Sequence, residues 1–187
     1  MEKKENQRVM LTKRLLKEAL LRLLEKKELG RISVSELCRE ADINRATFYK
    51  HYETCRDVLL DVETDVVADL RNITGHLSLE AEGKRYLEGV CRYVQEHAGV
   101  VKLLMSNNSD LSLELLFSSL NQSIWEEHSN PRFAVPLDEN GVELLTAFLG
   151  HGCYHLIRQW LCSSMNKTPE EIADLVYQLF DRNYRMR

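Results

Sequence analysis

The chain has 187 residues, a formal net charge of −4, 44% hydrophobic residues, 8 Gly and 3 Pro. This length allows one domain or two small ones, and the hydrophobic share is sufficient for real cores. The scarcity of Gly and Pro and the abundance of Leu, Glu and Lys favour helix, and no segment alternates apolar and polar residues as a strand would. The sequence therefore predicts an all-α protein.

Charge and cysteine patterns exclude further classes. The first ten residues, MEKKENQRVM, are charged rather than apolar, so we expect no signal peptide. The longest uncharged segment, between Glu143 and Arg158, is shorter than the roughly 20 apolar residues of a membrane helix. Five Cys without CxxC spacing predict neither a disulfide framework nor a zinc ribbon. We expect a cytoplasmic protein with reduced thiols and no membrane partner.

Charge is distributed unevenly along the chain. Residues 1–60 hold 14 Lys and Arg and 10 Asp and Glu, a net charge of +4, whereas the remainder holds 11 and 19, a net charge of −8. A basic front half and an acidic back half suggest two tasks, of which the first involves a polyanion.

The first helical pattern begins at Thr12, and we expect Gly30 to end it. A second, short helix follows, because Ser33 and Glu36 have the spacing of a capping box, in which each side chain accepts a hydrogen bond from the other residue's backbone amide. The apolar positions of the two helices follow three- and four-residue steps: Leu16, Ala19, Leu20, Leu23 and Leu24 in the first, then Val34, Leu37 and Ala41.

A turn and a third helix follow. Asp42 tolerates a left-handed backbone better than most residues, so we expect the chain to turn there. Asn44 can cap a short helix that keeps Phe48 and Tyr52, at i and i+4, for the core. This order is that of a helix-turn-helix. The alternative, a merely solvated amphipathic helix, does not account for two caps and a turn in sequence within some twenty residues.

The remaining side chains of the third helix suit a DNA major groove. Arg can pair with guanine, and the methyl groups of Thr or Ala can contact thymine. Tyr, Lys and His can hold phosphates, which also favour a helix N-terminus. We expect DNA contacts from Ser33, Ser35, Asn44, Arg45, Ala46, Thr47, Tyr49, Lys50, His51 and Thr54.

A long helix is expected next. Thr54 and Asp57 repeat the capping spacing, and the helix should run from residue 54 to about residue 74. Its inward positions are Val58, Val62, Val66, Leu70 and Ile73.

Residues 31–60, RISVSELCREADINRATFYKHYETCRDVLL, resemble the TetR/AcrR family of transcriptional regulators. Residues 47–52, TFYKHY, fall on the Thr-Leu-Tyr-x-His-Phe end of that family's pattern. Asp42 stands where the family's turn has Gly, and Cys55 stands where a Lys usually begins the fourth helix, with Arg56 beside it. The resemblance implies a DNA interface formed by Arg45, Thr47, Tyr49, Lys50 and His51.

The back half is also divided into helices. The segment YLEGVCRYVQEHAGVVKLLM should be helical with a break at Gly99, and LSLELLFSSLNQSIWEEH should be another helix, ended by SNPRFAVP. The helix over about 139–163 is apolar nearly all round, so several of its sides must be covered. TPEE at 168–171 opens the last helix with a Thr cap, a first-turn Pro and a carboxylate.

We expect two domains: a helix-turn-helix DNA-binding domain over 1–53 and a helical effector-binding and dimerisation domain over 54–187, linked by the helix from 54 to about 74. The stretch 148–179 also looks like the closing helix pair of many family members. The resemblance implies that the last two helices form a homodimer, which would place two recognition helices on a palindromic operator. It also implies a small-molecule effector, with candidate lining residues Trp125, His151, Tyr154 and His155.

These four side chains have another interpretation, as core or interface residues whose polar atoms are satisfied. His151 and His155 lie at i and i+4 with Cys153 between them, which suggests a metal site. However, Cys153 points away from the His face and no third ligand is evident. We therefore expect no metal and no cofactor.

The sequence thus predicts a dimeric, sequence-specific transcriptional regulator of double-stranded DNA, with repression as the expected outcome. The alternative is a regulatory interaction protein of the same fold that acts through a partner protein, as a coactivator would, and it is motivated by Asp42 and Cys55. We do not expect an enzyme, because no Ser/His/Asp set, phosphate-binding Gly loop or paired carboxylates stand out. Operator, effector, pathway and any redox role of Cys55 or Cys153 stay open at this point.

Overall fold

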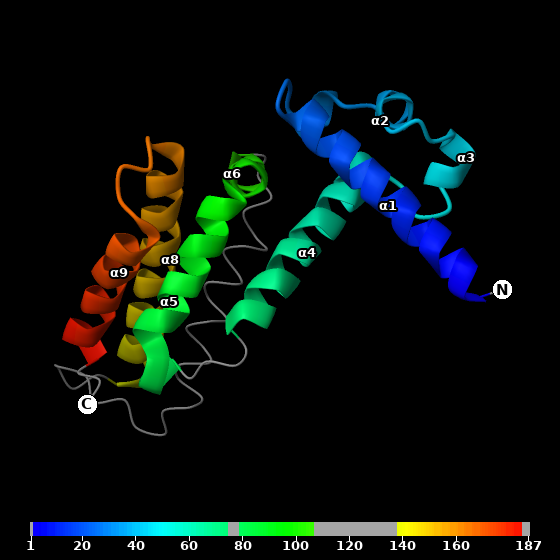
Figure 1. The fold of residues 1–187 in the computed structure, drawn as a ribbon. Coiled ribbons are helices and arrows are strands. Elements are labelled where there is room, and N and C mark those ends of the chain that lie inside the picture. The colour runs from blue at the N-terminus through cyan, green and yellow to red at the C-terminus, as the bar shows by residue number, and fades with distance from the viewer. Residues whose placement is uncertain (1, 75–78, 107–137, 185–187) are drawn as a thin grey trace.

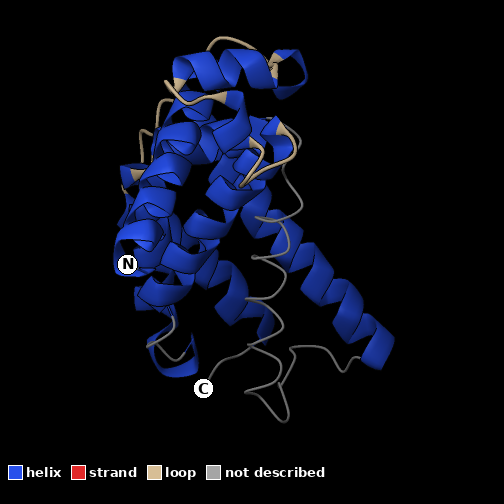
Figure 2. Cartoon of the chain, turned by 90° about the vertical axis from the view of Figure 1, so that its right-hand side faces the viewer, coloured by secondary structure: helices blue, strands red, loops and turns tan. Residues whose placement is uncertain are grey.

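The computed structural model describes residues 2–74, 79–106 and 138–184, and these contain helices, turns and loops but no strand (Figure 2). The expectation of an all-α fold is confirmed. The helices are α1 (Glu2–Leu24), α2 (Val34–Glu40), α3 (Arg45–Phe48), α4 (Cys55–Thr74), α5 (Leu79–Glu96), α6 (Ala98–Ser106), α8 (Glu139–Cys162) and α9 (Pro169–Tyr184), with a 3₁₀ turn at Leu29–Arg31.

Figure 1 shows two groups of helices joined by α4. At one end α1 packs on α2 and on the first half of α4, and α3 lies beyond α2. At the other end α5 runs along α9, while α8 contacts both α5 and α9. α6 lies between the groups, because it contacts α1 and α4 as well as α8. One long helix therefore belongs to both ends of the molecule.

Large apolar side chains fill the core of the first group. All five apolar positions expected for the first helix are buried, as are two of the three expected for the second. Removing such side chains from water contributes about 1.5–3 kcal/mol each. The fully buried members are Leu16, Leu20, Leu37, Phe48, Val58 and Leu59.

The first helix departs from expectation at both ends. α1 begins at Glu2 rather than Thr12, since residues 2–11 are mostly good helix formers without Gly or Pro. It ends at Leu24 rather than at Gly30, because the amides of Lys26 and Lys27 both turn back to the carbonyl of Leu23. Gly30 lies inside the 3₁₀ turn and does not adopt a positive φ.

Two details of α4 and α5 also differ. Ile73, expected in the core, is 39% exposed. It nevertheless packs closely on Gly89 of α5, because a Cβ atom at position 89 would lie only 3.0 Å from the Cγ2 of Ile73. The break expected at Gly99 falls at His97, since α5 ends at Glu96 and α6 begins at Ala98. The expected helix over 111–128 and the loop after it lie outside the described residues.

The last two described helices are α8 and α9. The cap before α9 is confirmed: the Thr168 amide donates to Glu171 at 2.8 Å, and the Glu171 amide donates to the Thr168 hydroxyl at 3.2 Å. Several large apolar side chains of the pair are nevertheless exposed: Leu144, Phe148, Leu175 and Leu179. Within the described ranges, none of the helices is long and apolar enough to span a membrane.

Candidate nucleic-acid interface

The helix-turn-helix begins with one half of the expected capping box. The Glu36 amide donates to the Ser33 hydroxyl at 3.2 Å, which satisfies one of the free amides at the start of α2. The Glu36 carboxylate also accepts from Lys27 Nζ at 2.5 Å, and this hydrogen bond is the main reason that the pKa of Glu36 is lowered. The turn after α2 has Asp42 at φ 54°, in the left-handed region, as expected.

Asn44 starts the recognition helix. Its side-chain oxygen accepts from the Thr47 amide at 2.7 Å, as expected for a cap. Only four residues, Arg45–Phe48, form regular α-helix. Helical turns continue beyond them, because the amides of His51 and Tyr52 both donate to the carbonyl of Phe48. The segment from Arg45 to Tyr52 therefore presents one continuous helical surface.

Two aromatic rings hold this segment on the core. Phe48 is fully buried and Tyr52 is 6% exposed, and their ring centroids lie 5.9 Å apart. Tyr49 packs edge-on against Phe48 at 5.4 Å but remains 52% exposed. The i, i+4 anchors predicted from the sequence are thus the anchors of the structure.

The side chains expected to contact DNA lie on the outside. Of the recognition surface, which we define as Asn44, Arg45, Ala46, Thr47, Tyr49, Lys50 and His51, five members are exposed, and Thr47 and His51 are half-buried. Ser33 and Ser35, at the start of α2, and Thr54, before α4, are exposed too. Burial of Arg45 and Tyr49 would have contradicted a DNA-binding role, and neither is buried.

The first turn of α4 differs from the family pattern in its chemistry. Cys55 is buried, so it cannot replace the phosphate-binding Lys, whereas the adjacent Arg56 is exposed. Thr54 and Asp57 form the expected reciprocal cap, with the Thr54 amide 2.7 Å from the Asp57 carboxylate and the Asp57 amide 3.3 Å from the Thr54 hydroxyl. Hydrogen bonds from the amides of Thr54 and Glu53 lower the pKa of Asp57.

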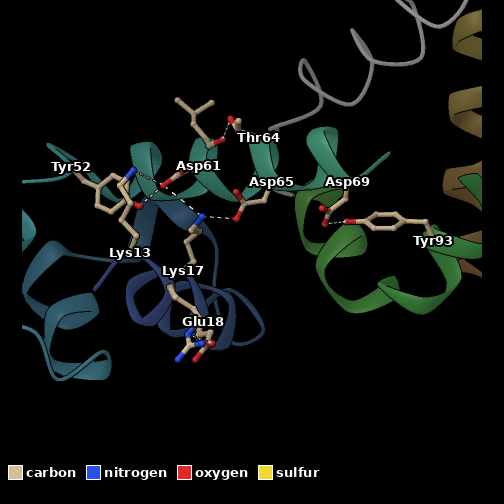
Figure 3. Close-up of polar contacts among 11 residues, drawn as sticks. Lys13, Lys17, Glu18, Tyr52, Asp61, Thr64, Asp65, Asp69 and Tyr93 are labelled. Atoms are coloured by element: carbon tan, nitrogen blue, oxygen red, sulfur yellow. Dashed lines mark hydrogen bonds and ion pairs between the residues drawn. The ribbon is translucent and has the colours of Figure 1, made fainter. Parts of the chain in front are cut away.

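A polar cluster behind the recognition helix escaped sequence analysis. The Tyr52 hydroxyl donates to Asp61 at 2.5 Å, and Lys13 of α1 donates to the same carboxylate oxygen at 3.1 Å (Figure 3). Asp65 and Asp69 follow Asp61 on the same face of α4 and contact Lys17 and Tyr93 (Figure 3). Two features of the sequence could have indicated this cluster: Asp at i, i+4 and i+8, which share one helix face, and a Tyr where the family pattern has Phe.

Three of the four candidate ligand-lining residues lie on α8, and the rings of Tyr154 and His155 are in edge contact. Tyr154 is buried, His151 and His155 are exposed on α8, and Trp125 lies outside the described residues. A cavity of about 980 Å³ lies between α1, α4 and the α5–α6 junction, and none of His151, Tyr154 and His155 lines it. Their role in effector binding stays a prediction.

Four of the five cysteines are structural in character, and the fifth, Cys162, is exposed. Cys38, Cys55, Cys91 and Cys153 are buried as free thiols, and burial raises the pKa of Cys55 to about 11 and that of Cys91 and Cys153 to about 12. Such thiols are protonated at neutral pH and are therefore poor nucleophiles. Among the described residues, His, Cys, Asp and Glu form no group of three or more that could hold a metal ion.

Comparison with known proteins identifies relatives of one kind. The model of a TetR-type "Transcriptional regulator C-terminal region" matches residues 83–182. The uncharacterized HTH-type transcriptional regulator YxbF of Bacillus subtilis (strain 168) is 31% identical over 174 residues, which cover 88% of this chain. The alignment covers 43% of YxbF, so the chain spans less than half the length of that relative.

Solved structures share the fold. A TetR transcriptional regulator from Streptococcus agalactiae 2603V superposes with a TM-score of 0.73 at 20% identity, covering 96% of this chain and 98% of that one. The dihydroxyacetone kinase operon activator DhaS superposes with a TM-score of 0.65 at 14% identity, covering 95% and 98%. At these identities the likeness establishes the fold and no shared ligand or operator.

Proposed function

The chain belongs to the TetR family of transcriptional regulators, and from this premise we propose that it binds a specific operator in double-stranded DNA through its recognition surface. One observation carries the proposal: the segment after Asp42 is capped by Asn44 and anchored by two buried rings, so that its other side chains face outward. Such a helix fits the major groove of B-DNA, which is about 12 Å wide.

Five side chains of the recognition surface, and Arg56 beside it, have chemical roles in this proposal. Arg45, exposed in the first turn, pairs with guanine, and the methyl groups of Ala46 and Thr47 contact thymine. Lys50 and His51 hold phosphates and so set the register on the duplex. Arg56 replaces the missing phosphate-binding Lys, because it is the exposed cation beside the buried Cys55.

We propose a homodimer formed through α8 and α9. Leu144 and Phe148 are 63% and 71% exposed, and Leu175 and Leu179 are 42% exposed, although each is a large apolar side chain. The two exposed residues of each helix are four positions apart and so lie on one face of it, and exposed apolar side chains grouped in this way favour a protein interface. A two-fold dimer buries the same surface on both subunits and presents two recognition surfaces to a palindrome.

We further propose that residues 1–53 read DNA and residues 54–187 bind an effector, with α4 as the lever between them. Support comes from the shape of α4, which packs on α1 at one end and on α5 at the other. A tilt of this helix would change the separation of the two recognition surfaces in a dimer. Repression in the cytoplasm, relieved or imposed by the effector, completes this proposal.

The alternative proposal is that the chain acts through a partner protein rather than an operator. Two observations favour it: Asp42 adds an exposed negative charge at the turn, and Cys55 is buried where a phosphate-binding Lys is usual. The structural neighbour DhaS is named as an operon activator, a description that applies to that protein.

Binding to DNA separates the two proposals. Fluorescence anisotropy would measure the affinity of the purified chain for DNA from its own upstream region, at about 50 and about 200 mM salt and beside a scrambled duplex. An operator-binding regulator prefers its own region and loses affinity with salt, because each phosphate contact releases counterions. Equal binding to both duplexes, or none at either salt concentration, would contradict operator binding and favour the partner-protein proposal.

A further inference from the structure

Tyr52 ends the recognition helix and carries one polar atom into the core. Its ring is 6% exposed and packs on Phe48, a position that Phe would fill equally well. The hydroxyl is therefore the feature that needs an explanation, since a buried hydroxyl without a partner is costly.

The hydroxyl is paired with Asp61, two turns into α4. It donates to Oδ2 of Asp61 at 2.5 Å, which is a short, charge-assisted hydrogen bond. Burial first, and then the hydrogen bond to Asp61, raise the pKa of Tyr52, so the phenol keeps its proton and donates throughout the physiological range.

Asp61 receives two further groups from α1. Lys13 Nζ lies 3.1 Å and Lys17 Nζ 3.7 Å from the same oxygen, and Lys13 also lies 5.3 Å from the centroid of the Tyr52 ring. Burial alone would raise the pKa of Asp61, but the hydrogen bonds from Tyr52 and Lys13 outweigh it and lower the pKa. Asp61 is therefore ionised at neutral pH and ties the end of the recognition helix and α1 to α4.

The same face of α4 makes an equivalent contact at its other end. Asp69 accepts from the hydroxyl of Tyr93 on α5 at 3.1 Å, and Tyr93 is 5% exposed, as buried as Tyr52 (Figure 3). Between them Asp65 pairs with Lys17 at 2.5 Å. The two Tyr–Asp pairs thus have the same chemistry, but only the first touches the recognition helix.

We propose that Asp61 is a positioning residue for DNA binding: with the Tyr52 hydroxyl it locks the end of the recognition helix to α4, so that the recognition surface moves with α4 as one body. This inference rests on the proposed function. Without the lock, the rings of Phe48 and Tyr52 still bury themselves, but the direction in which Lys50 and His51 point is no longer held by a polar contact. Operator affinity falls because the surface must be ordered during binding.

Comparing the operator affinities of two conservative variants tests this inference. Tyr52→Phe and Tyr93→Phe each remove one buried hydroxyl that donates to a carboxylate of α4. We expect Tyr52→Phe to weaken operator binding about tenfold, the size expected for one charge-assisted hydrogen bond, and Tyr93→Phe to stay within about twofold. Circular dichroism and thermal unfolding would show that each variant is folded. Anisotropy would then be measured below the unfolding temperature of both variants.

A third variant, Asp61→Ala, completes a double-mutant cycle with Tyr52→Phe. In an Asp61→Ala background the hydroxyl has lost its acceptor, so adding Tyr52→Phe should change affinity by less than about twofold. Full additivity of the two losses would overturn the inference. So would Tyr52→Phe with native affinity, or equal weakening by Tyr52→Phe and Tyr93→Phe.

A second measurement needs no DNA. The amides of His51 and Tyr52 both donate to the Phe48 carbonyl, and their hydrogen exchange reports how firmly the end of the helix is held. In Tyr52→Phe we expect these amides to exchange about tenfold faster than in Tyr93→Phe. If these amides exchange faster in Tyr52→Phe but the protein binds no operator, the proposed function is refuted and the contact between Tyr52 and Asp61 is not. If their exchange is unchanged, the positioning role of that contact is refuted and the proposed function is not.

Discussion

The recognition helix and the pair α8 and α9 lie at opposite ends of the molecule (Figure 1). The recognition surface exposes mainly polar side chains, whereas Leu144, Phe148, Leu175 and Leu179 of α8 and α9 are exposed apolar side chains. At the first end, apolar rings point inward and Arg45, Tyr49 and Lys50 face solvent. At the second, Phe148 is 71% exposed, whereas Phe48 is fully buried. A polar surface tolerates water until a polyanion replaces it, but an apolar surface gains most when another protein covers it.

The strongest test of this comparison replaces one Phe by Ala at each end of the molecule. Phe48→Ala should reduce the free energy of unfolding by about 3–5 kcal/mol, because it leaves a cavity in a packed core. Phe148→Ala should reduce the stability of the isolated protomer by less than about 0.5 kcal/mol, since most of its ring already meets water. Urea titrations at low protein concentration would measure both, and similar losses would contradict the contrast.

Association is the next largest effect. Phe148→Glu should raise the dissociation constant of the dimer at least about 100-fold, because it places an unpaired charge in an apolar interface. Sedimentation velocity at several concentrations would measure it. Leu60→Glu is the control, since Leu60 is an exposed apolar residue on α4, outside the proposed interface. Native-like dimerisation of Phe148→Glu would show that Phe148 of α8 is not part of the dimer interface.

Base reading should be sensitive to Arg45. Arg45→Ala should cost about 1–3 kcal/mol on the operator and little on a scrambled duplex, because a guanine contact is lost. Lys50→Ala should instead weaken binding to both duplexes similarly and reduce the salt slope by about 1. Anisotropy titrations of both variants on both duplexes would distinguish the roles, and identical profiles would show that Arg45 reads no base.

The smallest expected effect concerns the cap of α4 and depends on pH. The lowered pKa of Asp57 means that its carboxylate stabilises the fold above its unfolded pKa of about 3.9 and stops doing so as the pH falls through the lower folded value. Asp57→Ala should therefore cost about 1 kcal/mol at neutral pH, and the loss should vanish at strongly acidic pH. Chemical denaturation across this range would check it, and a pH-independent difference would assign the loss to packing.

Local signals in the sequence proved reliable because each depends on atoms within a few residues. The caps at Ser33, Asn44, Thr54 and Thr168 are all present, and so is the left-handed turn at Asp42. In each case a short side chain satisfies an amide three residues ahead, or a residue adopts a φ that its own side chain tolerates.

The limits of helices and the identity of exposed apolar positions were less predictable. Gly30 was expected to end α1, yet the helix ends at Leu24, and Ile73 fits the core pattern of α4 yet is partly exposed. Whether an apolar position is covered depends on which helix arrives beside it, and the pattern of one helix contains no information about that neighbour.

By itself the sequence determined the order of the helices, the turn between α2 and α3, the two aromatic anchors and hence the outward recognition surface. Only the tertiary structure decided that Tyr52 meets Asp61 and that Lys13, 48 positions earlier than Asp61, completes the cluster. The physical reason is that α1 must pack across α4 before these groups come within hydrogen-bond distance, and that packing is set by the shared core as a whole.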